Sequence, residues 1–96
     1  MRSPEDAEFI DFGDEDNQMH ITNKGVSLVE LEQVFFDERR FVPNKKPGRN
    51  APFLMVGRTK ANRPITAAVL YDEIRLAVIP ISARNSEDWE INKWKF

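Results

Sequence analysis

A few residues of this chain have side chains suited to handling a phosphate group and a proton. Arg84 stands in the stretch PISARNSEDWEINKW (80–94), where an apolar strand passes directly into an acidic helix. Its planar guanidinium can donate two parallel hydrogen bonds to phosphate oxygens and keeps its charge. We therefore expect Arg84 to hold a phosphate beside the start of the last helix. In the competing interpretation, Arg84 pairs with Glu87 or Asp88 and only fixes that helix.

His20 is the only histidine in the sequence, and histidine side chains gain and lose a proton near neutral pH. Lys24 follows four residues later, so the two side chains share one face of the predicted helix. Lys24 can hold phosphate or take part in proton transfer. The alternative is that His20 is a structural or solvent-exposed residue without a catalytic role.

Charge is distributed unevenly along the 96 residues, although the formal net charge is only -2. Residues 1–38 contain eleven acids and two bases, a charge of -9, and residues 39–84 contain ten bases and two acids, a charge of +8. A basic segment of this density is typical of proteins that bind a phosphate backbone. A solvated basic face balanced by neighbouring acidic elements is the other interpretation.

The hydrophobic pattern predicts an α+β fold: an antiparallel sheet of four to five strands, two N-terminal helices and one C-terminal helix. Asp14 is the predicted N-cap of the first helix, and Ser27 and Glu30 form a predicted capping box at the second helix. Pro80 cannot donate a ladder hydrogen bond, so it implies an edge strand or a bulge. We expect a disordered tail over 1–7, one domain over 8–96, and strands at 8–12, 39–42, 53–58, 65–71 and 74–82, with Asn85 or Ser86 capping the last helix.

Several motifs together resemble one family of bacterial toxins. They are HITNKGVSLVELEQVF (20–35), VGRTKANRP (56–64) and ISAR (81–84), followed by Glu90 and Trp94. In order and spacing they are similar to the BrnT toxins, small ribonucleases of type II toxin–antitoxin systems with a RelE-like fold. The resemblance extends over roughly residues 9–94.

The resemblance implies a metal-independent endoribonuclease toxin that cleaves RNA by attack of the 2′-OH and inhibits translation and growth. It also implies a cognate antitoxin, encoded alongside, that covers the basic groove, and contact with operator DNA only through that antitoxin. Trp94, which replaces a family tyrosine, would stack on a base, whereas Trp89 would seal the last helix against the sheet. The implied catalytic residues are Arg84, His20, Lys24 and Arg58, and the implied RNA-binding residues are Lys60, Arg63, Arg75, Arg49 and Trp94.

Two positions depart from the family pattern. Lys24 stands where these toxins commonly have a histidine, and Ile79 stands where they usually have an arginine, directly before Pro80. Arg75 is too far along the strand to replace that arginine, since four residues span roughly 13 Å. The alternative function is therefore a catalytically inactive binding module that docks an antitoxin or co-represses its operon.

The composition argues against several other classes of protein. With one histidine and no cysteine, no spacing resembles a zinc or two-metal site, and no cofactor is expected. No apolar run approaches the roughly 20 residues that cross a bilayer. A basic, apolar leader is also missing at the start of the sequence, so we expect a protein of the reducing cytoplasm.

Overall fold

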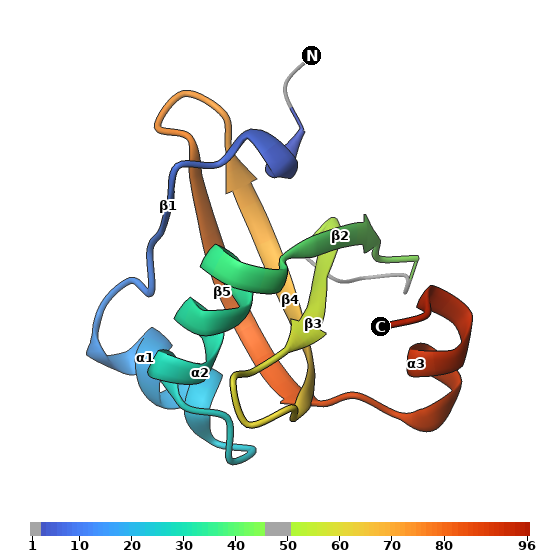
Figure 1. Cartoon of the computed structure of the whole chain (residues 1–96). Helices are drawn as coiled ribbons and strands as arrows, with labels where there is room; N and C mark the ends of the chain where they lie inside the picture. The colour runs from blue at the N-terminus through green and yellow to red at the C-terminus, as the bar shows by residue number, and fades with distance from the viewer. Residues whose placement is uncertain (1–2, 46–50) are drawn as a thin grey trace.

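The computed structural model describes residues 3–45 and 51–96, which form a five-stranded mixed sheet with three α-helices (Figure 1). The predicted α+β class, with two N-terminal helices and one C-terminal helix, is confirmed. In chain order the elements are the 3₁₀-helix η1 (Pro4–Asp6), β1 (Phe9–Ile10), α1 (Glu15–Thr22), α2 (Leu28–Gln33), the π-helix η2 (Val34–Glu38), β2 (Arg40–Pro43), β3 (Phe53–Arg58), β4 (Pro64–Asp72), β5 (Ala77–Asn85) and α3 (Asp88–Trp94).

The sheet has the strand order β1-β5-β4-β3-β2. Strands β2 to β5 form the expected antiparallel meander, whereas the short β1 pairs in parallel with β5, with Phe9 opposite Ala77. The sheet is therefore mixed rather than purely antiparallel. A parallel pair requires a long crossover, and the chain between β1 and β5 supplies it.

Pro80 lies in β5 at a break in the pairing with β4. Ala68 pairs with Ser82 and Val69 pairs with Pro80, so Ile81 is an additional residue on β5. Such a bulge accommodates a residue without an N–H donor. The sequence predicts an edge position or a bulge at Pro80, and the structure shows the bulge.

The starts of the first two helices follow the sequence signals. The Asp14 side chain accepts a hydrogen bond from the Asn17 amide and caps α1. At α2, the Ser27 hydroxyl accepts from the Glu30 amide, while the Glu30 carboxylate accepts from the Ser27 amide. Both predicted caps are confirmed.

The hydrophobic core lies between one face of the sheet and the layer formed by α1, α2 and η2. Ile21, Leu31 and Phe35 from this layer are buried in the same cluster as Met55 and Ala67 of the sheet. The layer approaches β3 so closely that a Cβ atom at Gly57 would meet the Glu38 carbonyl oxygen and Val34 Cγ1 at 2.9 Å. The layer of α1, α2 and η2 does not cover the opposite face of the sheet.

The structure differs from the sequence prediction at residues 3–7, at the start of β5 and at the cap of α3. Residues 3–7, expected to be part of a disordered tail, include the turn η1, in which Pro4 is buried, and the Arg39 side chain donates to the carbonyl oxygens of Ala7 and Glu5. Strand β5 begins at Ala77, because the chain after Asp72 forms a wider turn in which the Asp72 carboxylate accepts from the Ile74 and Arg75 amides. The cap of α3 is Glu87 rather than Asn85 or Ser86, because β5 continues to Asn85.

Candidate functional site

A pocket of about 520 Å³ lies between the open face of the sheet and α3. This size is within the range of small-ligand sites, about 300–1,000 Å³. Figure 1 shows α3 standing apart from α1 and α2, next to β2 and β3. The lining residues are Lys24, Val42, Pro43, Asn44, Lys45, Leu54, Thr66, Ala68, Ser82, Arg84, Trp89, Glu90, Lys93 and Trp94.

The floor of the pocket follows from the alternation of side chains along the strands. Thr66 pairs with Arg84 and Ala68 pairs with Ser82, and all four side chains line the pocket. The residue between them, Ala67, belongs to the core on the other face. Because the side-chain period of a strand is two, one face of β4 and β5 is committed to the core and the other is free to form a site.

Arg84 is held in this floor by a buried carboxylate. Its two terminal nitrogens lie 2.5 and 2.9 Å from the two oxygens of Glu90, whose side chain is fully buried. The Glu87 amide also donates to Glu90 at 2.8 Å. The alternative in which Arg84 fixes the last helix is therefore seen, with Glu90 as its partner rather than Glu87 or Asp88.

The pair shifts the pKa values of both groups. Hydrogen bonding to Glu90 raises the pKa of Arg84, although partial burial acts in the opposite direction. Burial alone would raise the pKa of Glu90, but the hydrogen bonds from Arg84 and from the Glu87 amide outweigh it and lower the pKa. Both groups are consequently charged at neutral pH.

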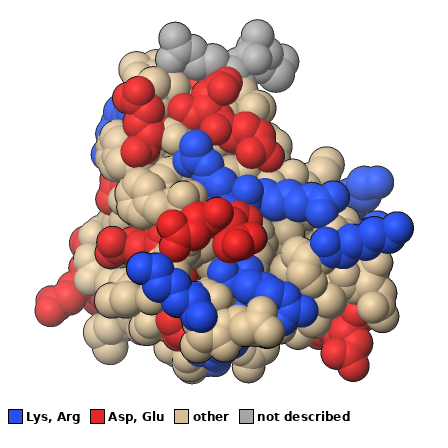
Figure 2. Space-filling model, in the orientation of Figure 1, with Lys and Arg blue, Asp and Glu red and all other residues tan. Residues whose placement is uncertain are grey.

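The pocket is basic despite this neutralised pair. Its lining holds four basic side chains and one carboxylate, a formal charge of +3. Lys24, Lys45 and Lys93 make no ion pair with any residue that the structure describes. Figure 2 shows basic side chains projecting from the side of the molecule where α3 and β2 lie. An anionic ligand would be attracted to this surface.

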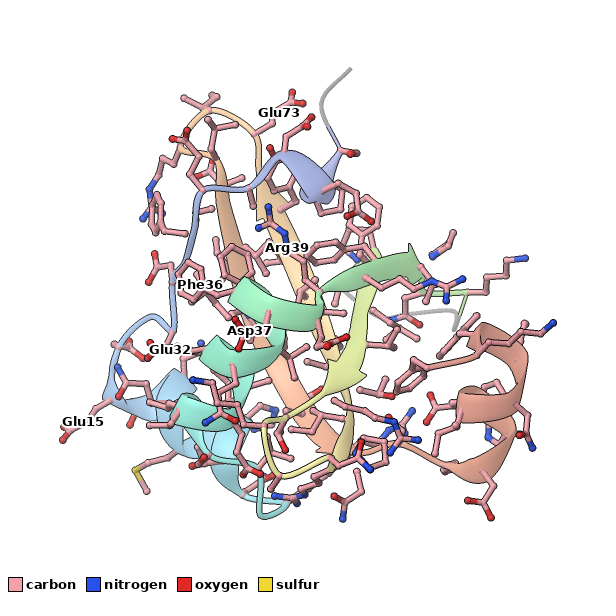
Figure 3. The ribbon with its side chains drawn as sticks, viewed as in Figure 1. Glu15, Glu32, Phe36, Asp37, Arg39 and Glu73 are labelled. Carbon is pink, nitrogen blue, oxygen red and sulfur yellow. The ribbon has the colours of Figure 1, made fainter. Side chains whose placement is uncertain are left out.

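Acidic residues gather on the helical layer that covers the opposite face of the sheet. Glu15, Glu32 and Asp37 are exposed there, and Figure 3 shows them pointing outward from α1, α2 and η2. These exposed carboxylates therefore lie away from the pocket, on the other side of the sheet.

Two tryptophans line the α3 side of the pocket. Their ring centroids are 5.8 Å apart and the rings are inclined at 56°. Trp89 is 51% exposed, so the expectation that it seals the helix against the sheet is wrong. Its indole N–H instead donates to Glu87, and Arg40 donates to the main-chain oxygen of Trp94. The Lys93 ammonium lies 5.9 Å from the centre of the Trp94 ring, so aromatic and basic groups meet on this side of the pocket.

The predicted catalytic residues are only partly brought together. Arg84 and Lys24 line the pocket. His20 is exposed on α1 and is not part of the lining. Arg58 also lies outside the lining, where it donates to the carbonyl oxygen of Asn62 at 3.0 Å and to Phe96 at 3.1 Å.

Among the predicted RNA-binding residues, only Trp94 lines the pocket as far as the described residues extend. Arg63 forms an ion pair with Glu30 at 2.8 Å, and Arg75 pairs with Asp11 at 2.8 Å at the other end of β5. Lys60 is exposed in the β3–β4 connection, and Arg49 lies outside the described residues. Arg63 and Arg75 are thus occupied by carboxylates from the acidic N-terminal third, as the solvated-face interpretation proposed.

Several lining residues were not identified from the sequence. Lys45, Lys93, Thr66 and Ser82 line the pocket, although none of them is among the predicted site residues. The alternation around Ala67 was a usable signal for the two hydroxyl side chains, because one strand face had to be apolar. The pairing of Glu90 with Arg84 had no comparable signal, since it depends on where α3 returns to the sheet.

In residues 3–45 and 51–96 no three acidic or histidine side chains are grouped so that they could hold a metal ion. The helices in these ranges are also too short or too polar to cross a bilayer.

Comparison with known proteins gave no match to a family model, to a curated protein or to a solved structure.

Proposed function

We propose that the pocket binds a single strand of RNA and that the chain acts there as a BrnT-like, metal-independent endoribonuclease toxin in the bacterial cytoplasm. The observation that carries the proposal is the meeting of two tryptophans and three lysines, none ion-paired to a described residue, on one pocket. The lysines come from the α1–α2 connection, the segment after β2, and α3. The toxin-like motifs of the sequence support the assignment to this class.

The chemistry of the lining suits a single strand. Lysine ammonium groups neutralise phosphates, and aromatic rings stack on unpaired bases, worth about 1–3 kcal/mol per base. The hydroxyl group of Ser82 on the floor can bond to base or sugar edges, whereas the buried Thr66 hydroxyl is bonded to Ser86 at 2.8 Å. A duplex presents its bases stacked and paired, so the tryptophans would have nothing to stack on.

Cleavage requires removal of the 2′-OH proton and stabilisation of charge on the phosphate. Lys24 is a lining residue able to transfer a proton, and it is better placed than His20, which lies outside the pocket. Arg84 can stabilise the phosphate once its guanidinium donors turn from Glu90 to the ligand. Lys93 and Lys45 would hold the flanking backbone.

A second candidate function is a binding module without catalysis, which docks a cognate antitoxin and reaches operator DNA only through it. Two observations favour it: both terminal nitrogens of Arg84 are engaged by Glu90, and the single histidine of the sequence, His20, lies outside the pocket. The same basic surface would then receive an acidic segment of the antitoxin.

Single-turnover cleavage of a labelled RNA, in the presence of a chelator, separates the two functions. We expect the wild-type chain to cleave and Arg84→Lys to lose about 10²- to 10³-fold in rate, because lysine keeps the charge but lacks the planar fork. Lys24→Ala should lose a similar factor, and Lys95→Ala, outside the lining, should cleave normally. RNA binding without cleavage at any protein concentration would support the binding module.

A further inference from the structure

The C-terminal helix is attached to the sheet by polar contacts rather than by an apolar core. Glu90 is the one buried residue of α3, and no α3 side chain belongs to the hydrophobic cluster of the described residues. Three arginines make the attachments: Arg84 to Glu90, Arg40 to the main-chain oxygen of Trp94, and Arg58 to that of Phe96. The position of α3 therefore depends on which groups Arg84, Arg40 and Arg58 bind.

Glu90 occupies Arg84 in the way a phosphate would. Each carboxylate oxygen accepts from a different terminal nitrogen of the guanidinium, and Arg84 Nη1 also lies 3.3 Å from the Asn85 carbonyl oxygen. Carboxylate and phosphate engage this fork with the same two-pronged geometry. A ligand phosphate that reaches the full fork must therefore displace Glu90.

From this arrangement we propose that Glu90 is a built-in competitor for phosphate, which restrains anion binding at Arg84 until a ligand displaces it. The inference rests on the proposed function, because it concerns regulation of the same pocket. The displaced carboxylate would keep the hydrogen bond from the Glu87 amide but lose the positive charge that compensates it, which disfavours its burial. Because α3 lacks an apolar anchor in the core, the helix can shift and carry Glu90 toward water.

The substitution Glu90→Gln tests the competition. Glutamine retains the size of the side chain and one oxygen acceptor but loses the charge, so Arg84 becomes available. We expect the affinity for a single-stranded oligoribonucleotide to rise about 5-fold or more, in the range of typical coupling between sites. Asp88→Asn is the matched control, since it removes the same charge from an exposed position on the same helix and should change the affinity less than about 2-fold.

A double-mutant cycle distinguishes competition between Glu90 and phosphate for Arg84 from a general repulsion between the Glu90 charge and RNA. If Glu90 acts through Arg84, the gain from Glu90→Gln should disappear when Arg84 is also replaced by alanine. If the gain persists there, or equals that of Asp88→Asn, the competition model is wrong.

Carboxylate ¹³C NMR of the wild-type chain provides a readout that does not depend on the folding of a variant. The Glu90 signal should move as the oligoribonucleotide saturates the protein. Binding by the wild type with an unmoved Glu90 signal would overturn the inference and leave the proposed function standing. Binding by Glu90→Gln alone would support the inference, and no binding by either chain would overturn both.

Discussion

At the scale of single residues, the ion pair between Arg84 and Glu90 attaches the C-terminal helix α3 to the sheet. The Arg84 side chain is 29% exposed and the Glu90 side chain is not exposed at all. Removing one partner of such a pair leaves a charge without compensation, whereas replacing both partners by apolar residues can be nearly neutral. Arg84 therefore has a structural role whether or not it also contacts a ligand.

We predict that Arg84→Ala lowers the free energy of unfolding by about 3–5 kcal/mol, because Glu90 remains buried without its partner. Arg84→Met combined with Glu90→Leu should recover most of that loss. Urea denaturation followed by circular dichroism measures both values. A single variant as stable as the wild type would show that the pair contributes little.

At the scale of secondary-structure elements, the close approach of η2 to β3 leaves no space at Gly57. A Cβ atom there would lie 2.9 Å from a main-chain oxygen and from Val34 Cγ1. We predict that Gly57→Ala destabilises the protein by about 1–3 kcal/mol through overpacking. Lys60→Ala, at an exposed position just beyond β3, should stay within about 0.5 kcal/mol of the wild type. Equal melting temperatures for the two variants would contradict the packing described for η2.

Local signals predicted the elements that local chemistry determines. The caps at Asp14 and Ser27 depend on residues within one helical turn, and β3 was predicted with its observed ends, Phe53 to Arg58. The parallel pairing of β1 with β5 and the burial of Pro4 depend on contacts between distant segments. No periodicity in the sequence contains that information.

The candidate site was predicted only in part, because it too depends on contacts between distant segments. Arg84, Lys24 and Trp94 stand in recognisable motifs and do line the pocket. Arg63 and Arg75 have the same charge, but the fold places each beside an acidic residue far away in the sequence, Glu30 and Asp11. Whether a basic residue is free or paired is decided by tertiary structure.

At the scale of the whole molecule, three carboxylates couple folding to pH. Hydrogen bonding to Arg75 lowers the pKa of Asp11. For Glu30 and Glu90, burial alone would raise the pKa, but hydrogen bonds, including those from Arg63 and Arg84, lower it. A lowered pKa in the folded state means that the unfolded chain binds protons more readily, so acid favours unfolding.

We predict that this contribution to stability is complete above the ordinary values of 3.8 for aspartate and 4.5 for glutamate, and is lost as pH falls through the lower folded values. Urea titrations at neutral pH and at several acidic values measure the decline. Glu30→Gln should show a shallower decline than the wild type, because one of the three groups no longer titrates. A free energy of unfolding that stays constant to about pH 3 would contradict the role of the three pairs.

The central claim is that the pocket binds single-stranded RNA, and two matched double variants test it most directly. Lys24→Ala/Lys93→Ala removes two lysines from the lining, and Lys60→Ala/Lys95→Ala removes the same charge from exposed positions outside it. The toxin resemblance implied RNA binding by Lys60, whereas the pocket proposal gives it none. Fluorescence anisotropy of a labelled oligoribonucleotide would be measured between about 50 and 200 mM salt. We expect the pocket variant to bind more weakly and the slope of log K against log salt to become shallower by about 1.4, because each phosphate that a lysine neutralises on a single strand accounts for about 0.7 of the slope. The variant outside the pocket should behave as the wild type does. Equal affinities and slopes for the two variants would show that RNA, if it binds, does not bind in this pocket.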